Sequence, residues 1–118
     1  IIVIERSHAL AKQLKCRFPN IHIIEDDASH LAQLLTQEKR PICAIISSLP
    51  LRSLPKAIAQ QILEQIKQVL PVGSRYIQYT YSFMKDPFYV PSNCRHISSK
   101  RIWWNIPPAR VDVWVKKS

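Results

Sequence analysis

Hydrophobic and polar residues follow two different periods along this chain, and the periods predict strands and helices in turn. Apolar runs at 1–4, 21–24 and 42–47 are typical of short buried strands. The run at 42–47 is apolar nearly throughout, which predicts cover on both faces, as in a parallel sheet. Between these runs, apolar residues recur every three or four positions, as in amphipathic helices. The helical positions are Leu10, Ala11, Leu14 and Phe18, then Leu31, Leu34 and Leu35, then Ile58, Ile62, Ile66 and Val69.

Local signals for helix ends agree with this division. Ser7 and Asp27 are of the residue types that cap helix amino ends, and Pro55 suits a first helical turn. Pro19 follows the first predicted helix, and Gly73 follows the third. The predicted order up to residue 74 is therefore strand, helix, strand, helix, strand, helix.

The pattern changes after residue 74, where strands replace helices. Residues 75–81, 95–104 and 110–115 are predicted strands, and the last two are close enough to form an antiparallel hairpin through 105–109. In the last strand, three valines alternate with Asp112 and Trp114, so its two faces differ. The whole order predicts an α/β fold: a mostly parallel sheet with helices on both faces and a terminal antiparallel hairpin.

Composition narrows the classes of function. The net charge is +9, and residues 75–118 carry eight Lys/Arg against two Asp/Glu. This excess indicates an anionic partner (a membrane surface, a nucleic acid or an acidic protein) or simply a solvated basic surface. Three cysteines and four histidines show no metal-ligand spacing, so we expect no metal site and reduced thiols in a cytoplasmic protein. No apolar run reaches 18 residues, and the one glycine excludes a glycine-rich phosphate loop.

Candidate chemistry lies where the predicted parallel strands end, because ligands of open α/β sheets bind at their carboxyl ends. Glu5 ends the first strand and has the carboxylate that two ribose hydroxyls need, although it also suits a helix amino end. Asp27 suits an adenine amino group, with the Ala28 amide beside it, and equally a helix cap. The loop 47–50 after the third strand has backbone carbonyls that suit an acceptor amine, or it is a plain turn.

Together these segments resemble the bacterial phospholipid N-methyltransferases of the class I S-adenosylmethionine-dependent methyltransferase superfamily. The matching stretches are IVIERSHALAKQLKCRFPN, IHIIEDDA, IISSLPLRSLP, YIQYTYS and WWNIPPARVDVW. They cover most of the chain, and the combination of SSLPLRSLP with NIPPARV is the most specific part.

The resemblance implies a Rossmann-like fold, S-adenosylmethionine as cofactor and methyl transfer to the amine of a headgroup such as phosphatidylethanolamine. It implies one partial domain over 1–118, with the cofactor side in 1–74 and the acceptor side in 75–118. A phospholipid at a membrane surface would be the partner, and the protein would be cytoplasmic, peripheral on the inner face of the membrane. The implied cofactor residues are Glu5, Asp27, Ala28 and Ser47, and the implied acceptor residues are Ser48, Leu49, Pro50, Tyr79 and Tyr81. No general base is identified.

Two departures from the family stand out. The family begins with a central strand and a glycine-rich turn, which this sequence lacks, so the chain resembles the carboxy-terminal two-thirds of the domain. Cys43 stands where the family commonly has an acidic residue, and its apolar surroundings predict a packed thiol.

Two rival functions remain open. A nucleic-acid methyltransferase of the rRNA adenine type would suit the basic charge, but such enzymes typically carry an aromatic residue after the loop proline, where this chain has Leu51. A truncated fragment without enzymatic activity is the second. The aromatic residues Phe88, Tyr89, Trp103 and Trp104 suit a headgroup level, although strand packing is the expected role of the Trp pair.

Overall fold

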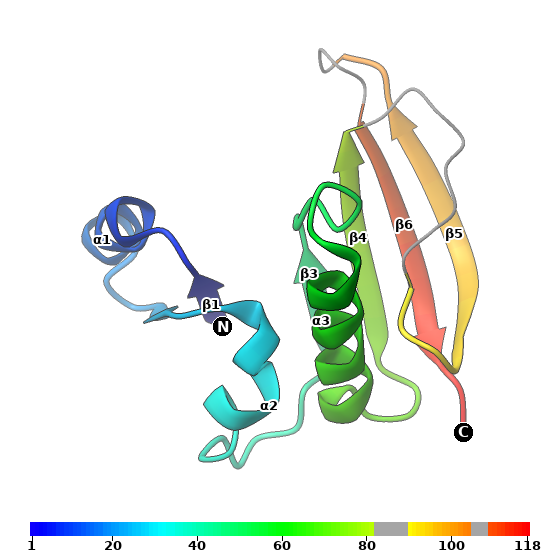
Figure 1. The fold of residues 1–118 in the computed structure, drawn as a ribbon, viewed down its shortest axis with the longest axis horizontal. Helices are drawn as coiled ribbons and strands as arrows, with labels where there is room; N and C mark the ends of the chain where they lie inside the picture. Colours follow the sequence, from blue (N-terminus) through cyan, green and yellow to red (C-terminus); the bar gives the residue numbers. More distant parts are fainter. Residues whose placement is uncertain (82–89, 105–108) are drawn as a thin grey trace.

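A computed structural model describes residues 1–81, 90–104 and 109–118, and of Tyr81 it describes the backbone alone. The elements follow the predicted order of alternating strands and helices and then three strands (Figure 1). They are β1 (Ile2–Glu5), α1 (His8–Arg17), β2 (His22–Glu25), the 3-10 turn η1 (Ala28–His30), α2 (Leu31–Leu34), β3 (Ala44–Ser47), α3 (Lys56–Val69), β4 (Arg75–Tyr81), β5 (Cys94–Ile102) and β6 (Ala109–Lys116).

The strands form two sheets. Strands β1 and β2 pair in parallel, with Glu5 opposite Glu25. The second sheet has the order β3-β4-β6-β5, in which β3 and β4 are parallel. Strand β6 is antiparallel to both β4 and β5, so the expected antiparallel hairpin is confirmed. Among the described residues no ladder joins β1 to β3, so each of these strands is paired along one edge.

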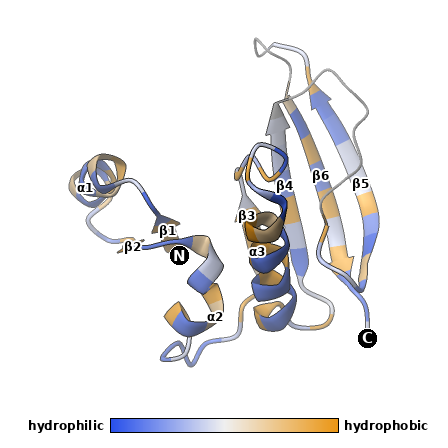
Figure 2. Cartoon of the chain, viewed as in Figure 1, coloured by the Kyte–Doolittle hydropathy of each residue, from blue (hydrophilic) through white to orange (hydrophobic). Residues whose placement is uncertain are grey.

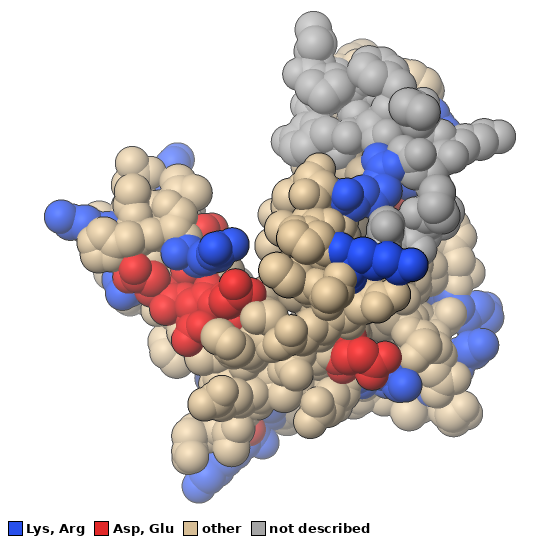
Figure 3. Space-filling model, viewed as in Figure 1, with Lys and Arg blue, Asp and Glu red and all other residues tan. Residues whose placement is uncertain are grey.

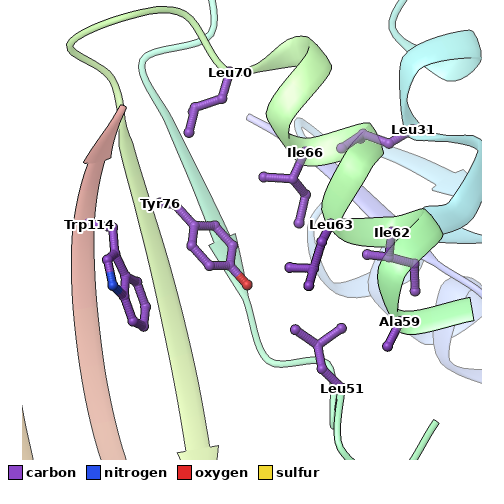
Figure 4. Packing of buried hydrophobic residues seen from close by; sticks show 9 residues of the cluster. All are labelled: Leu31, Leu51, Ala59, Ile62, Leu63, Ile66, Leu70, Tyr76 and Trp114. Atoms are coloured by element: carbon purple, nitrogen blue, oxygen red, sulfur yellow. The ribbon is translucent and has the colours of Figure 1, made fainter. Parts of the chain in front are cut away.

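The core lies between α3 and one face of the second sheet, and Figure 4 shows its side chains pointing toward one another. Its buried members are Leu31, Leu51, Ala59, Ile62, Leu63, Ile66, Leu70, Tyr76 and Trp114. Helix α3 shows polar and apolar bands in Figure 2, as its amphipathic sequence predicts. The helix turns Ala59 and Leu63 inward, whereas Ile58 of the predicted stripe is 41% exposed.

Both predicted side-chain caps are present. The Leu10 amide donates to Ser7 Oγ at 3.3 Å, and the Ser29 amide donates to Asp27 Oδ1 at 2.8 Å. The helix predicted after Asp27 is short, because η1 takes its first turn and α2 spans only Leu31–Leu34. Of the residues of α1, only Ala11 is buried, so most of its predicted apolar stripe is open to solvent.

Several predictions of burial are wrong. Ile46 of β3 is 76% exposed, so the described chain covers this strand on the α3 face but not on the other. Cys43 precedes β3 and is exposed rather than packed. Strand β5 ends at Ile102, so Trp103 and Trp104 lie in a turn, and they are 64% and 91% exposed. Phe88 and Tyr89 lie outside the described residues.

Candidate functional site

The carboxyl ends of β1 and β2 bring two predicted cofactor residues together. Glu5 ends β1, and its backbone carbonyl accepts a hydrogen bond from the Asp26 amide at 3.1 Å. Asp27 follows one residue later, so the two carboxylates come from neighbouring strand ends. Acidic side chains gather over this end of the small sheet (Figure 3). The predicted juxtaposition follows from parallel pairing, which places the carboxyl ends of both strands at the same edge.

Each carboxylate is held in place by the backbone that follows its strand. Glu5 Oε1 accepts the Ser7 amide at 2.9 Å. Asp27 Oδ1 accepts the Ser29 amide, and Asp27 Oδ2 lies 3.9 Å from Arg6 Nε. The hydrogen bond from the Ser29 amide lowers the pKa of Asp27. Asp27 is therefore an ionised, acceptor-only group near neutral pH.

These groups fit the adenosine part of S-adenosylmethionine. Ribose hydroxyls and an adenine amino group are donors, and carboxylates at fixed positions accept from them. Ala28 begins η1 directly after Asp27. The methionine part has no glycine loop here, because Gly73, the one glycine, precedes β4 at the opposite end of the sheet.

An exposed ion pair supports the turn that carries Asp27. His30 Nδ1 lies 2.8 Å from Asp26 Oδ1, and this hydrogen bond raises the pKa of His30 above 6.5 and lowers that of Asp26 below 3.8. A raised histidine pKa stabilises the fold below about pH 6.5, and this is lost as pH rises through the folded value. A lowered aspartate pKa stabilises it above about pH 4, and this is lost as pH falls through the folded value.

We therefore expect the His30–Asp26 pair to stabilise the fold fully only between about pH 4 and pH 6.5. An NMR titration should show His30 titrating above 6.5, and Asp26→Asn should return its pKa toward that ordinary value. An unchanged His30 titration in the variant would contradict the pair.

The loop after β3 is the second part of the site. Ser47 is buried and its Oγ accepts the Leu49 amide at 3.2 Å. The Leu49 carbonyl accepts the Leu51 amide at 2.9 Å, and Leu51 is 5% exposed in the core. Ser48 and Pro50 are exposed. The loop is thus fixed at both ends and open in its middle.

A residue that the sequence analysis missed also holds this loop. Gln78 of β4 is 7% exposed, and its Nε2 donates to the Leu49 carbonyl at 3.0 Å and to the Tyr79 carbonyl at 3.1 Å. The Tyr76 hydroxyl donates to Gln78 Oε1. Burial raises the pKa of Tyr76, so its hydroxyl keeps its proton. In the sequence, nothing distinguished Gln78 from any other polar residue of an alternating strand.

Gln78→Leu is expected to loosen this loop. Removing the side-chain donor should speed amide exchange at Leu49 and Leu51 by about tenfold, because a buried hydrogen bond contributes about 0.5–1.5 kcal/mol and an orphaned partner adds to the loss. Hydrogen exchange followed by NMR measures this directly. Gln61→Leu is the matched control, because Gln61 is exposed and reaches the Ser29 carbonyl only at 3.4 Å. Equal acceleration throughout α3 would mean a general loss of stability instead.

The predicted acceptor tyrosines are less clearly placed. Tyr79 is half-buried in β4, opposite Val111, and points to the face away from Gln78 because neighbouring strand residues alternate. The side chain of Tyr81 lies outside the described residues. The two parts of the site come from two separate sheets. The β1-β2 sheet carries Glu5 and Asp27, and the sheet that contains β3 carries the loop from Ser47 to Pro50.

Next to the acceptor end, β6 holds a buried ion pair, with a histidine of β5 beside it, that the sequence analysis did not identify. Asp112 is 0% exposed, with Arg110 Nε at 2.8 Å and His96 Nε2 at 3.3 Å from its oxygens. At the opposite end of the sheet, a pocket of about 250 Å³ lies between α2, the segment before β3 and the end of α3. Within the described chain, no group of three His, Cys, Asp or Glu residues is arranged to hold a metal, and no helix is long and apolar enough to cross a membrane.

One curated relative is similar in sequence. The ornithine lipid N-methyltransferase of Singulisphaera acidiphila is 32% identical over 84 residues, which cover 68% of this chain and 44% of that protein. The chain thus spans less than half the length of this relative. No protein-family profile matches the chain.

Solved structures match nearly the whole chain. The TehB-like methyltransferase of Corynebacterium glutamicum has a TM-score of 0.72 at 15% identity, over 98% of this chain and 67% of that chain. The N-methyltransferase NodS of Bradyrhizobium japonicum WM9, solved with S-adenosyl-L-homocysteine, has a TM-score of 0.69 at 10% identity, over 99% and 66%. An rRNA methylase of Streptococcus thermophilus has a TM-score of 0.68 at 18% identity, over 99% and 73%.

At these identities the solved structures establish the fold, and the lipid N-methyltransferase adds a relationship in sequence. Both agree with the resemblance that the sequence motifs indicated. The chain has the Rossmann-like fold of the class I S-adenosylmethionine-dependent methyltransferases, and its sequence is similar to that of a lipid N-methyltransferase.

Proposed function

We propose that this chain acts in methyl transfer from S-adenosylmethionine to the amine of a phospholipid headgroup such as phosphatidylethanolamine. The observation that carries the proposal is the sequence relationship to an ornithine lipid N-methyltransferase, which spans most of this chain. The basic excess of residues 75–118 supports it, since Lys and Arg near an anionic leaflet favour binding by about 1 kcal/mol each.

In this proposal the cofactor side lies in 1–74 and the acceptor side in 75–118. Glu5 binds the ribose hydroxyls, and Asp27 binds the adenine amino group with the Ala28 amide beside it. Ser47 shapes the loop at the methyl group, and the exposed middle of the loop receives the amine. The acceptor residues are Ser48, Leu49 and Pro50 of this loop, together with Tyr79 and Tyr81.

The cofactor supplies an electrophilic methyl group on a sulfonium. The chain's own contribution is positioning: it fixes the adenosine, orders the loop and excludes water from the acceptor amine. The amine must be neutral when it attacks, and no described residue of this chain is assigned as the base that takes its proton. The hydrogen bonds from Gln78 and within the loop keep the backbone carbonyls in fixed directions, which suits orientation of an amine.

The second candidate is a nucleic-acid methyltransferase. The same basic charge and the likeness to an rRNA methylase fold favour it. A flipped base needs a stacking partner at the loop, and aromatic side chains usually supply it. Here Leu51 follows the loop proline and is buried in the core, so it offers no exposed stacking face. We therefore place the lipid first.

A transfer assay separates these candidates. The purified chain is incubated with methyl-labelled S-adenosylmethionine and either phosphatidylethanolamine vesicles, ornithine lipid vesicles or rRNA. We expect label in the lipid extract, at a rate reduced at least tenfold by Glu5→Ala, since a charged hydrogen-bond acceptor contributes about 1.5–3 kcal/mol. Label in RNA alone would replace the proposal by the second candidate, and no label in any acceptor would contradict both.

A further inference from the structure

Two adjacent tryptophans are exposed at the end of β5, which is unusual for residues of this size. Trp104 is 91% exposed and Trp103 is 64% exposed, whereas Trp114, the third tryptophan of the chain, is 4% exposed in the core. Packing therefore accounts for Trp114 but not for the pair. Tryptophan is enriched at membrane interfaces, where its ring lies among apolar groups and its N–H stays among polar ones.

The strand that leads to this pair is basic. Residues 94–104 contain Arg95, Lys100 and Arg101 and no acidic residue, and all three basic side chains are exposed. The Arg101 guanidinium lies 5.8 Å from the centre of the Trp103 ring. Aromatic rings beside exposed cations are complementary to an anionic lipid surface, since the cations attract the leaflet and the rings enter the headgroup layer.

The position of the pair fits the proposed acceptor site. Ile102 at the end of β5 pairs with Ala109, and Ala109 pairs with Tyr81 at the end of β4. Strands β3, β4 and β5 are parallel, so the pair lies at the same end of the sheet as the loop after Ser47. In the sheet order β3-β4-β6-β5, one strand separates β5 from β4 and two separate it from β3, which carries the loop (Figure 1).

We propose that Lys100, Arg101, Trp103 and Trp104 form a docking tip that binds an anionic membrane surface and brings the carboxyl end of the sheet to the lipid headgroups. The purpose of this tip rests on the proposed lipid acceptor, but its binding to a membrane requires neither cofactor nor methyl transfer. A flat lipid surface accommodates two neighbouring exposed rings together. A lipid surface as the partner also agrees with the relative in sequence, which is an ornithine lipid N-methyltransferase.

Vesicle binding tests the tip directly. The probes are vesicles of phosphatidylethanolamine with phosphatidylglycerol, with and without brominated acyl chains, and zwitterionic phosphatidylcholine vesicles as the comparison. We expect the chain to cosediment with the anionic vesicles and brominated lipid to quench its tryptophan fluorescence. Trp103→Ala/Trp104→Ala should weaken binding about tenfold or more and leave only the unquenched emission of Trp114. Lys100→Glu/Arg101→Glu should weaken it at least about twenty-fivefold, about fivefold for each cation.

The controls separate docking from folding and from catalysis. Both tryptophans are exposed, so thermal unfolding of the double alanine variant should match that of the wild type. Arg95→Glu/Lys117→Glu is the matched charge control, because these exposed residues lie at the other end of the sheet and should weaken binding less than the pair at the tip. Vesicle binding without methyl transfer would support membrane binding by the tip and contradict only the proposed function.

Several results would contradict the proposed docking tip. Equal vesicle binding by the double alanine variant would do so, as would the absence of quenching in bound protein. Binding to single-stranded RNA that depends on the tryptophans, with none to anionic vesicles, would assign the same residues to a nucleic-acid surface instead.

Discussion

Asp112→Ala is expected to lower the free energy of unfolding by about 3–5 kcal/mol, which is the usual cost of breaking a buried ion pair from one side. Asp112 is fully buried, and its two oxygens face Arg110 Nε at 2.8 Å and His96 Nε2 at 3.3 Å. The side chain of Arg110 is only 10% exposed, so its guanidinium cannot regain full hydration when the carboxylate is removed. Denaturant unfolding of the variant measures the loss.

The scale of this loss matters because small domains are stable by only about 5–15 kcal/mol. Asp26→Ala is the control, since it removes an equally short carboxylate contact, the 2.8 Å contact to His30, at an exposed site. Its effect should be far smaller, as for exposed ion pairs in general. A loss below about 1 kcal/mol at Asp112 would mean that this carboxylate is solvated rather than buried between its partners.

Glu5→Ala is expected to weaken binding of S-adenosylmethionine about tenfold to a hundredfold. A carboxylate that accepts two ribose hydroxyls contributes about 1.5–3 kcal/mol per hydrogen bond, part of which water replaces in the variant. The Ser7 amide donates to Glu5 Oε1 at 2.9 Å, which fixes the orientation of this carboxylate. Isothermal calorimetry with the wild type and the variant gives the ratio of dissociation constants.

The chain offers a closely matched control for this measurement. Glu25 is directly opposite Glu5 in the parallel ladder, but its oxygens lie 2.9 and 3.1 Å from His8 Nδ1. Glu25→Ala removes the same charge at the same level of the sheet, so it separates the ribose contact from the general field of the acidic cluster. Equal weakening by both variants would mean that charge, rather than a specific contact of Glu5, governs affinity.

The parts of the fold that were predictable from sequence depend on local signals. Ser7 and Asp27 cap their helical turns because short polar side chains bond to nearby backbone amides, which requires no tertiary information. The proximity of Glu5 and Asp27 was predictable because alternating strands and helices favour parallel pairing, and parallel strands end together. The order of strands and helices was predictable from the periods of the apolar residues, which are also local signals.

The parts that were not predictable depend on which face a helix covers and which strands meet. In β6 the face with Arg110, Asp112 and Trp114 is buried, while the alternating valines are half-buried. Hydrophobic pattern alone does not reveal this, because the buried face carries Arg110 and Asp112, which pair with each other there. Insertion of β6 between β4 and β5 is a matter of tertiary pairing, and the sequence carries no local signal for it.

The candidate site shows the same division. The positions of Glu5, Asp27 and Ser47 at or just after strand ends were predictable because each follows an apolar run. Gln78 was not, since it reaches the Leu49 carbonyl only through the register of β3 against β4. The Trp pair was assigned to a strand because aromatic residues favour strands, but β5 ends at Ile102, directly before it.

The most direct test of the central claim is an amide chemical-shift map of the isotope-labelled chain titrated with S-adenosylmethionine. The claim is that the carboxyl ends of β1, β2 and β3 form the cofactor site. We expect the largest shifts at Glu5, Asp27, Ala28 and Ser47. Shifts confined to the 250 Å³ pocket around Leu35, Ile42 and Val69 at the other end of the sheet, or no shifts at saturating cofactor, would contradict it.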